Sequence, residues 1–264
     1  MGFRARGTEG VRAIVPFILL TTQRTGSSWL TTLLDSHPDT DAYGELFLVG
    51  EGMRPPWGAR EVERFWSFRS RGPQTGRPRY RPRVTLAYLG HLFTSNPSAR
   101  AIGFKLMYDQ AARYPEVLLY CVRHQVRLVH LVRTNVLDVV ISRELMRARG
   151  KPHATVGEDV AAARVILDPR SIRRRLRALE LETAFFRRML GSLRLPHLEI
   201  TYHDLVSEPA TLQSVLRFLD LRDDASLWSP LVRMNDRKQS ELVSNYDAIA
   251  ATLRGTRFDS LLTG

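Results

Sequence analysis

At 264 residues, with 44% apolar and 25% charged side chains, the chain has the size of one α/β domain, or at most two small ones, and is not of the disordered class. Its formal charge of +12 indicates an anionic partner, such as nucleotide phosphates, an acidic acceptor or a membrane surface. No apolar run approaches the roughly 18 residues of a membrane span, and the single cysteine, Cys121, excludes an internal disulfide.

The first predicted element is a buried strand over residues 17–22. A Gly/Ser-containing turn follows, and apolar residues then recur at helical spacing from Trp29 until Pro38 stops the helix. A secretory signal is the alternative interpretation of the N-terminus. The apolar run 14–20, however, contains Pro16 and lacks a cleavage site of small residues.

The turn between this strand and helix has the composition of an anion-binding loop. Arg24 supplies a planar cation, Gly26 lets the backbone approach a phosphate, and hydroxyls come from Thr25, Ser27 and Ser28. The N-terminus of a helix also favours an anion. The loop lacks the first glycine and the lysine of the nucleoside-triphosphatase loop, which indicates a nucleotide whose transferred group needs no metal. An ordinary strand–helix turn is the alternative.

Regular patterning is interrupted at residues 53–83, where proline, glycine and arginine are frequent. Because α/β patterning continues on both sides, we interpret this stretch as an insertion rather than a linker between domains. It serves either as a lid that shapes an acceptor site or as a solvated surface loop.

The rest of the chain alternates strands and helices. Further strands are predicted at residues 101–107, 127–132 and 197–202. Helices are predicted after an Asn135 cap, over about 171–190, after a Ser207 cap with Pro209 in the first turn, and over about 241–253 with Gly255 at the end. This alternation predicts an α/β fold with a mostly parallel central sheet flanked by helices on both faces.

A second motif follows the strand at 127–132. Arg133 ends that strand, and Ser142 lies in the next helix. Because α/β sheets bind ligands at the carboxyl ends of their strands, we expect this pair to face the same edge as the first loop. Alone the pair is a weak sign, since strands often end in arginine and helices often contain serine.

Together the two motifs resemble the sulfotransferase family that uses 3′-phosphoadenosine-5′-phosphosulfate (PAPS). The loop Arg24-Thr25-Gly26-Ser27-Ser28-Trp29 is similar to the family's 5′-phosphosulfate loop, and Arg133…Ser142 is similar to the pair that grips the 3′-phosphate. The resemblance continues through Tyr202-His203-Asp204-Leu205 and into the tail at Lys238-Gln239. It implies a single P-loop-like domain over residues 1–264, interrupted by the insertion at 53–83.

Within the family, the chain looks like the branch of bacterial carbohydrate and tyrosylprotein sulfotransferases. In that branch the first loop carries arginine, and a Gly-Glu pair follows the first helix; here the pair is Gly44-Glu45, and Glu45 lies 21 residues after Arg24. We expect one helix and a return loop to bring Glu45 back over the phosphosulfate. The resemblance implies that Glu45 is the general base, a role that suits a carboxylate whose pKa is raised by partial burial. A surface or capping glutamate is the alternative.

Two lysines are further candidates. Lys105 interrupts the apolar strand 101–107, where a charge needs a partner such as a bound sulfate or phosphate. The resemblance implies that Lys105, with Arg24, neutralises charge as the sulfuryl group leaves; a lysine that extends to solvent is the alternative. Lys238 either reaches the cofactor phosphates or belongs to an exposed basic pair.

The chain departs from the family pattern at two positions. Ser142 follows Arg133 by nine residues, one more than in many members, and His203 replaces a usual glutamate, which we interpret as structural. The remaining histidines lack ligand spacing, and with one cysteine and no Asp/His cluster the sequence predicts no metal.

The sequence thus predicts a PAPS-dependent sulfotransferase that acts by in-line displacement on a hydroxyl of a carbohydrate, lipid, small metabolite or peptide tyrosine. We expect a cytoplasmic, bacterial enzyme that binds a nucleotide co-substrate and no nucleic acid; its charge is compatible with peripheral membrane contact. One alternative is a basic protein that binds nucleic acid without catalysis. Another is a kinase of related architecture with ATP and magnesium, against which the missing loop lysine argues.

Overall fold

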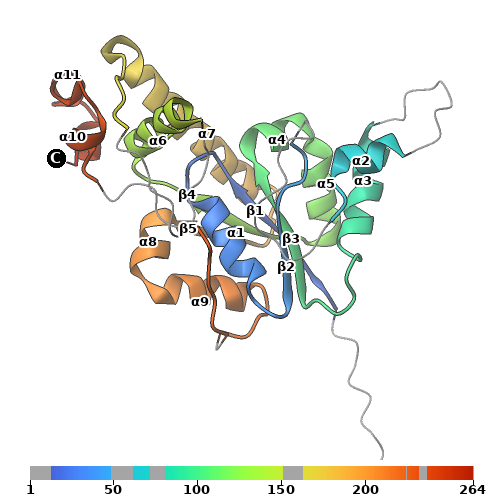
Figure 1. The fold of residues 1–264 in the computed structure, drawn as a ribbon. Coiled ribbons are helices and arrows are strands. Elements are labelled where there is room, and N and C mark those ends of the chain that lie inside the picture. Colours follow the sequence, from blue (N-terminus) through green and yellow to red (C-terminus); the bar gives the residue numbers. More distant parts are fainter. Residues whose placement is uncertain are drawn as a thin grey trace, which may run out of the picture.

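A computed structural model of the chain describes residues 13–48, 62–71, 81–150, 163–223, 225–231 and 237–263. These residues form a parallel sheet of five strands in the order β2-β3-β1-β4-β5 (Figure 1). The strands are β1 (Val15–Thr21), β2 (Thr40–Glu45), β3 (Ala101–Met107), β4 (Arg127–Val132) and β5 (His197–Thr201). Because β1 lies between β3 and β4, the loop after β1 is at the point where strand order reverses and where open α/β sheets bind ligands.

Helices connect the strands and cover the sheet. They are α1 (Ser27–Asp35), α2 (Phe65–Ser70), α3 (Arg81–Leu92), α4 (Tyr108–Arg113), α5 (Pro115–His124), α6 (Val136–Arg149), α7 (Pro169–Ser192), α8 (Tyr202–Ser207), α9 (Pro209–Phe218), α10 (Gln239–Leu242) and α11 (Tyr246–Leu253). A short 3₁₀ turn, Asp259–Leu261, follows α11. In the described part of the chain, no helix is long and apolar enough to cross a membrane.

The two faces of the sheet bury alternate residues of β1. Phe17 and Leu19 pack with α1, α8 and α9 on one face. Ile18 and Leu20 pack with α2 to α5 and the C-terminal part of α7 on the other face. Because both faces are covered, interior strands are buried along their length rather than on alternate residues, as β3 shows.

A third apolar cluster joins α6, the N-terminal part of α7, α10 and α11. Figure 1 shows α10 and α11 beside α6, at the end of the molecule opposite α2 and α3. The Val165 amide donates to the Leu242 carbonyl over 2.9 Å, and the Ser244 amide donates to the Val165 carbonyl over 2.8 Å. The tail of the chain is therefore bonded to the segment before α7 and packed against α6, the helix that follows β4.

The predicted α/β class, with a parallel sheet covered on both faces, is confirmed. The strands predicted at 101–107 and 127–132 are β3 and β4. Asn135 caps α6, since its side chain accepts hydrogen bonds from the amides of Leu137 and Asp138. Gly255 has a φ of 68° just after the C-cap of α11, the conformation that a C-terminal glycine favours.

Two predicted helix ends are wrong. Ser207 is the last residue of α8, and Glu208 takes the N-cap position of α9. The reason is that Thr201 caps an additional short helix by accepting from the Asp204 amide. The predicted last helix is interrupted between α10 and α11, because Val243 is extended and forms a β-bridge with Val165.

Part of the stretch predicted as an irregular insertion is helical and packed. Helix α2 lies within it, and Phe65 is fully buried and stacked on Phe47 with ring centroids 4.8 Å apart. The prediction of irregular structure is therefore wrong for residues 65–70, where aromatic side chains fix the backbone to the core, and for residues 81–83, which begin α3. Residues 53–61 and 72–80 lie outside the described residues.

Candidate active site

The loop between β1 and α1 has an unusual backbone. Arg24 has a φ of 67° and Gly26 a φ of 82°, both in the left-handed region. A Cβ atom at position 26 would lie 2.4 Å from the ring of Tyr202, so both the backbone conformation and the packing require glycine. The loop leads into α1, whose first-turn N–H groups have no acceptor within the helix. This geometry fits an anion at the helix N-terminus.

Hydroxyl groups hold the loop to the sheet. Thr21 Oγ1 donates to the Leu131 carbonyl over 2.8 Å and lies 2.6 Å from Thr25 Oγ1. Thr25 Oγ1 donates to the Thr22 carbonyl over 3.0 Å. Trp29, also predicted to bind the cofactor, packs with its side chain against the α1–α8–α9 face. The side chains of Thr25 and Trp29 thus shape the loop from within the fold.

Lys105, Glu45 and Ser28 meet where β3, β2 and α1 adjoin. Lys105 Nζ lies 3.1 Å from Glu45 Oε1 and donates to Ser28 Oγ over 3.0 Å. Glu45 Oε2 accepts a hydrogen bond from Gln110 Nε2 over 2.9 Å. The side chain of Lys105 is 8% exposed, whereas that of Glu45 is 23% exposed. The ammonium is therefore enclosed, and the carboxylate remains accessible from one side.

An edge strand, not the expected return loop, brings Glu45 to this position. Residues of β2 pair in parallel with β3, and Glu45 lies opposite Lys105 after an irregularity in register at Gly44. Irregularities of this kind change the direction in which the next side chain points. The strand was missed because its sequence, Thr-Asp-Ala-Tyr-Gly-Glu, contains polar residues and a glycine.

Arg24 and Ser142, predicted in separate motifs, are in direct contact. Arg24 Nε donates to Ser142 Oγ over 2.9 Å, and Arg133 Nη1 donates to the Arg24 carbonyl over 3.3 Å. Arg133 also forms an ion pair with Asp138 at 2.9 Å, and its guanidinium lies 4.8 Å from the centroid of the Tyr202 ring. The structure thus brings the two motifs together at the carboxyl edge of the sheet.

Positive charge accumulates around Arg24. Burial, and after it the nearby charges of Arg133 and Arg149, lower the pKa of the Arg24 guanidinium to about 10. A bound anion would relieve both the desolvation and the repulsion between guanidiniums. The sequence-based search missed Arg149, although it follows Ser142 by two helical turns and so shares its face of α6.

The tail of the chain is attached to this region through Gln239. Its buried side chain donates to Asp138 Oδ1 over 2.7 Å and to the Leu261 carbonyl over 3.0 Å. Asp138 in turn is the ion-pair partner of Arg133. Lys238 immediately precedes α10 and is exposed, so a contact between Lys238 and the cofactor stays a prediction.

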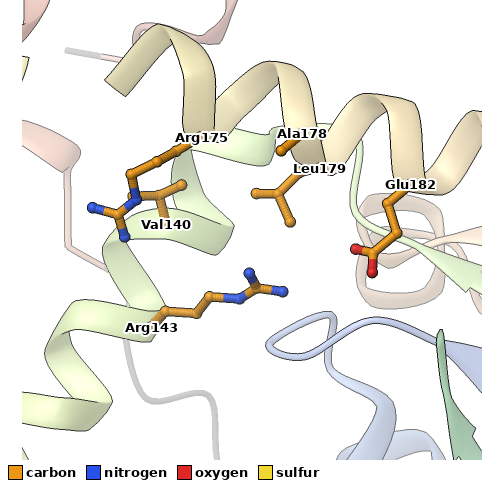
Figure 2. Close-up of a pocket in the computed structure, with 6 residues that line it drawn as sticks. All are labelled: Val140, Arg143, Arg175, Ala178, Leu179 and Glu182. Atoms are coloured by element: carbon orange, nitrogen blue, oxygen red, sulfur yellow. The ribbon is translucent and has the colours of Figure 1, made fainter. Parts of the chain in front are cut away.

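A cavity of about 330 Å³ lies between α6 and α7 (Figure 2). Its lining consists of Val140, Arg143, Arg175, Ala178, Leu179 and Glu182. Arg143 Nη2 donates to Thr22 Oγ1 over 2.9 Å, and Thr22 Oγ1 donates to Glu182 Oε2 over 3.4 Å. The cavity therefore adjoins the residue that follows β1, directly before the β1–α1 loop.

Two charged groups on opposite sides of this cavity are partly desolvated. Burial lowers the pKa of Arg143 and raises the pKa of Glu182. Figure 2 shows the Arg143 guanidinium extending from α6 into the space below α7. No local sequence pattern indicates this cavity, because α7 is distant from the loop in the chain. Over the ranges that the structure describes, no cluster of three or more His, Cys, Asp or Glu could hold a metal ion.

A model of the sulfotransferase family matches residues 16–225, a range that contains the loop, Glu45, Lys105 and the Arg133–Ser142 motif. The chain belongs to the sulfotransferase family. It is therefore a transferase enzyme, and the residues at the carboxyl edge of the sheet are candidates for sulfuryl transfer.

Solved structures of sulfotransferases are similar at low sequence identity. A sulfotransferase from Alicyclobacillus acidocaldarius is 16% identical, with 91% of this chain and 93% of that chain covered and a TM-score of 0.49. The sulfotransferase domain from the curacin biosynthetic pathway is 14% identical, with 95% of this chain and 81% of that chain covered and a TM-score of 0.45. No curated protein matches the chain.

Gly26→Ala is expected to destabilise this sulfotransferase by about 1–3 kcal/mol, because alanine is strained at a left-handed φ and its Cβ overlaps the Tyr202 ring. Urea denaturation followed by circular dichroism measures the free energy of unfolding. Gly191→Ala in α7 is the matched control, since a Cβ there meets nothing within 4 Å. Equal loss of stability in the two variants would contradict the role assigned to Gly26.

Proposed function

We propose that this sulfotransferase moves the sulfuryl group of PAPS to a hydroxyl group of an acceptor. The observation that carries the proposal is the contact of Lys105 with both Glu45 and Ser28, which joins a carboxylate to the N-terminus of α1. The β1–α1 loop fits an anionic donor through its helix N-terminus, its hydroxyl groups and Arg24. When bound, PAPS supplies the activated sulfuryl group and leaves as adenosine 3′,5′-bisphosphate.

Each residue at this edge has a role in the proposed reaction. Glu45 accepts the proton of the acceptor hydroxyl, whose oxygen forms the new bond to sulfur while the bond from sulfur to the phosphate oxygen breaks. Lys105 and Arg24 stabilise the negative charge that moves onto the leaving phosphate, together with the N–H groups at the start of α1. As in phosphoryl transfer, positioning and electrostatics supply most of the rate acceleration.

Calorimetric titration with adenosine 3′,5′-bisphosphate tests the donor. We expect micromolar binding that is weakened about tenfold or more by Arg133→Ala and by Ser142→Ala, because each variant removes a hydrogen bond to a charged phosphate. Arg188→Ala, an exposed arginine of α7, serves as the control and should bind normally.

Titration with ATP and magnesium, and with single-stranded DNA, distinguishes the competing functions. Preference for ATP with magnesium would favour a kinase. Steeply salt-dependent binding to DNA, with no affinity for the bisphosphate, would favour a protein that binds nucleic acid.

Glu45→Gln is expected to lower kcat by about 10²–10⁴-fold, because the amide cannot accept the proton of the acceptor. Affinity for adenosine 3′,5′-bisphosphate should stay near that of the parent. Transfer of radiolabelled sulfate from PAPS to a panel of hydroxyl acceptors measures turnover, with Glu208→Gln at the surface as the control. Equal turnover of Glu45→Gln and the parent would remove Glu45 from the role of base.

We also propose that the acceptor occupies the cavity between α6 and α7. The cavity adjoins Thr22, at the edge that carries the β1–α1 loop. Asp109 influences the pKa of both Arg143 and Glu182, and its neighbour Gln110 bonds to Glu45. These relationships support an acceptor site on the side of the loop where the proposed base lies.

Ala178→Phe, which fills this cavity, is expected to raise the KM for the acceptor while affinity for adenosine 3′,5′-bisphosphate is unchanged. Leu181→Phe is the control, because Leu181 is exposed on the same helix and does not line the cavity. The KM of both variants is measured with a panel of acceptors that contains a methyl glycoside, a phenol and a tyrosine peptide. An unchanged KM in Ala178→Phe would place the acceptor elsewhere.

A further inference from the structure

Arg149, the last residue of α6, has two buried nitrogen atoms without a hydrogen-bond partner among the described residues. Its Nε and Nη1 atoms are buried, and neither has a hydrogen-bond partner in the structure as described. Buried N–H groups of a cation without a partner are costly, and native proteins rarely retain them without a reason. A bound anion would supply the missing acceptors.

The position of Arg149 relates it to the proposed donor site. Ser142 and Arg149 are seven residues apart on α6, so both lie on one face, about 10 Å apart along the helix axis. Ser142 accepts a hydrogen bond from Arg24. The charge of Arg149 lowers the pKa of Arg24, and the charge of Arg237 lowers the pKa of Arg149. Arg149 thus lies within electrostatic range of two cations from other segments of the chain, Arg24 and Arg237.

Carboxylates neutralise this group of cations only in part. Arg237 is paired with Glu241 and Arg133 with Asp138. Within the described ranges, Arg149 has no salt bridge. A phosphate monoester carries about two negative charges and three acceptor oxygens, so it balances such a group better than a neutral ligand or a single carboxylate.

We infer that Arg149 binds a terminal phosphate monoester and, on the basis of the proposed function, that this group is the 3′-phosphate of the donor. Arg149 then discriminates PAPS from its analogue without the 3′-phosphate. The side chain of Arg149 contributes to binding of the donor, whereas Glu45 and Lys105 act in the chemistry at sulfur.

Calorimetric titration of the full chain tests this inference with two nucleotides, adenosine 3′,5′-bisphosphate and adenosine 5′-monophosphate. Arg149→Gln should weaken binding of the bisphosphate about tenfold or more and leave binding of the monophosphate unchanged. Arg147→Gln is the matched control: Arg147 lies on the same helical turn, is 66% exposed and is paired with Glu144. It should bind both nucleotides like the parent.

A thermal unfolding experiment without nucleotide separates binding from a structural role. Because Arg149→Gln removes a partly buried cation that repels its neighbours, the melting temperature should be equal to or above that of the parent. A lower melting temperature together with equal weakening of both nucleotides would show a structural role and overturn the inference. Undiminished affinity of Arg149→Gln for the bisphosphate would overturn it as well. If the parent binds no bisphosphate, the proposed function itself fails, and the inference fails with it.

Discussion

The buried ammonium group of Lys105 constrains the assembly of the active edge. A charge within an interior strand needs partners, because desolvation without them is costly. Its partners come from two other elements, Glu45 of β2 and Ser28 of α1. The same contacts that satisfy the lysine therefore fix the distance between the carboxylate and the helix N-terminus. Since β2 and β3 belong to the sheet and α1 packs against it, the site is built on rigid elements of the core.

The arginines around the β1–α1 loop differ from Lys105 in the charges that surround them. Arg133 has a carboxylate partner in Asp138, and Gln239 holds that carboxylate from the tail. Arg24 and Arg149 are crowded by like charges, and burial lowers the pKa of both. A protein selected for stability alone would not retain such crowding, whereas a protein that binds a dianion gains affinity from it. The unbalanced charge is therefore best explained by a ligand.

Local sequence patterns predicted much of the fold and the two motifs. They did not predict the contacts between segments that are distant in the chain. The strand before Arg24 and the strand with Lys105 are apolar enough to be recognised. Strand β2 was missed because pairing with β3, not its composition, makes it a strand. Nothing near Tyr202 in sequence shows that its ring excludes a side chain at Gly26. The lining of the cavity by α7 likewise depends on how two helices pack, which no short pattern encodes.

Helix α6 links the two halves of the proposed reaction. Ser142 faces Arg24, whereas the next residue, Arg143, is rotated by about 100° and faces Thr22 and the cavity. A shift of α6 would therefore move Ser142, at the proposed donor site, together with Arg143, in the wall of the proposed acceptor cavity. The helix is held by the Asn135 cap and by apolar packing against α7, α10 and α11. Because the tail supplies part of that packing, the proposed reaction would depend on residues far from the sulfur atom to align donor and acceptor.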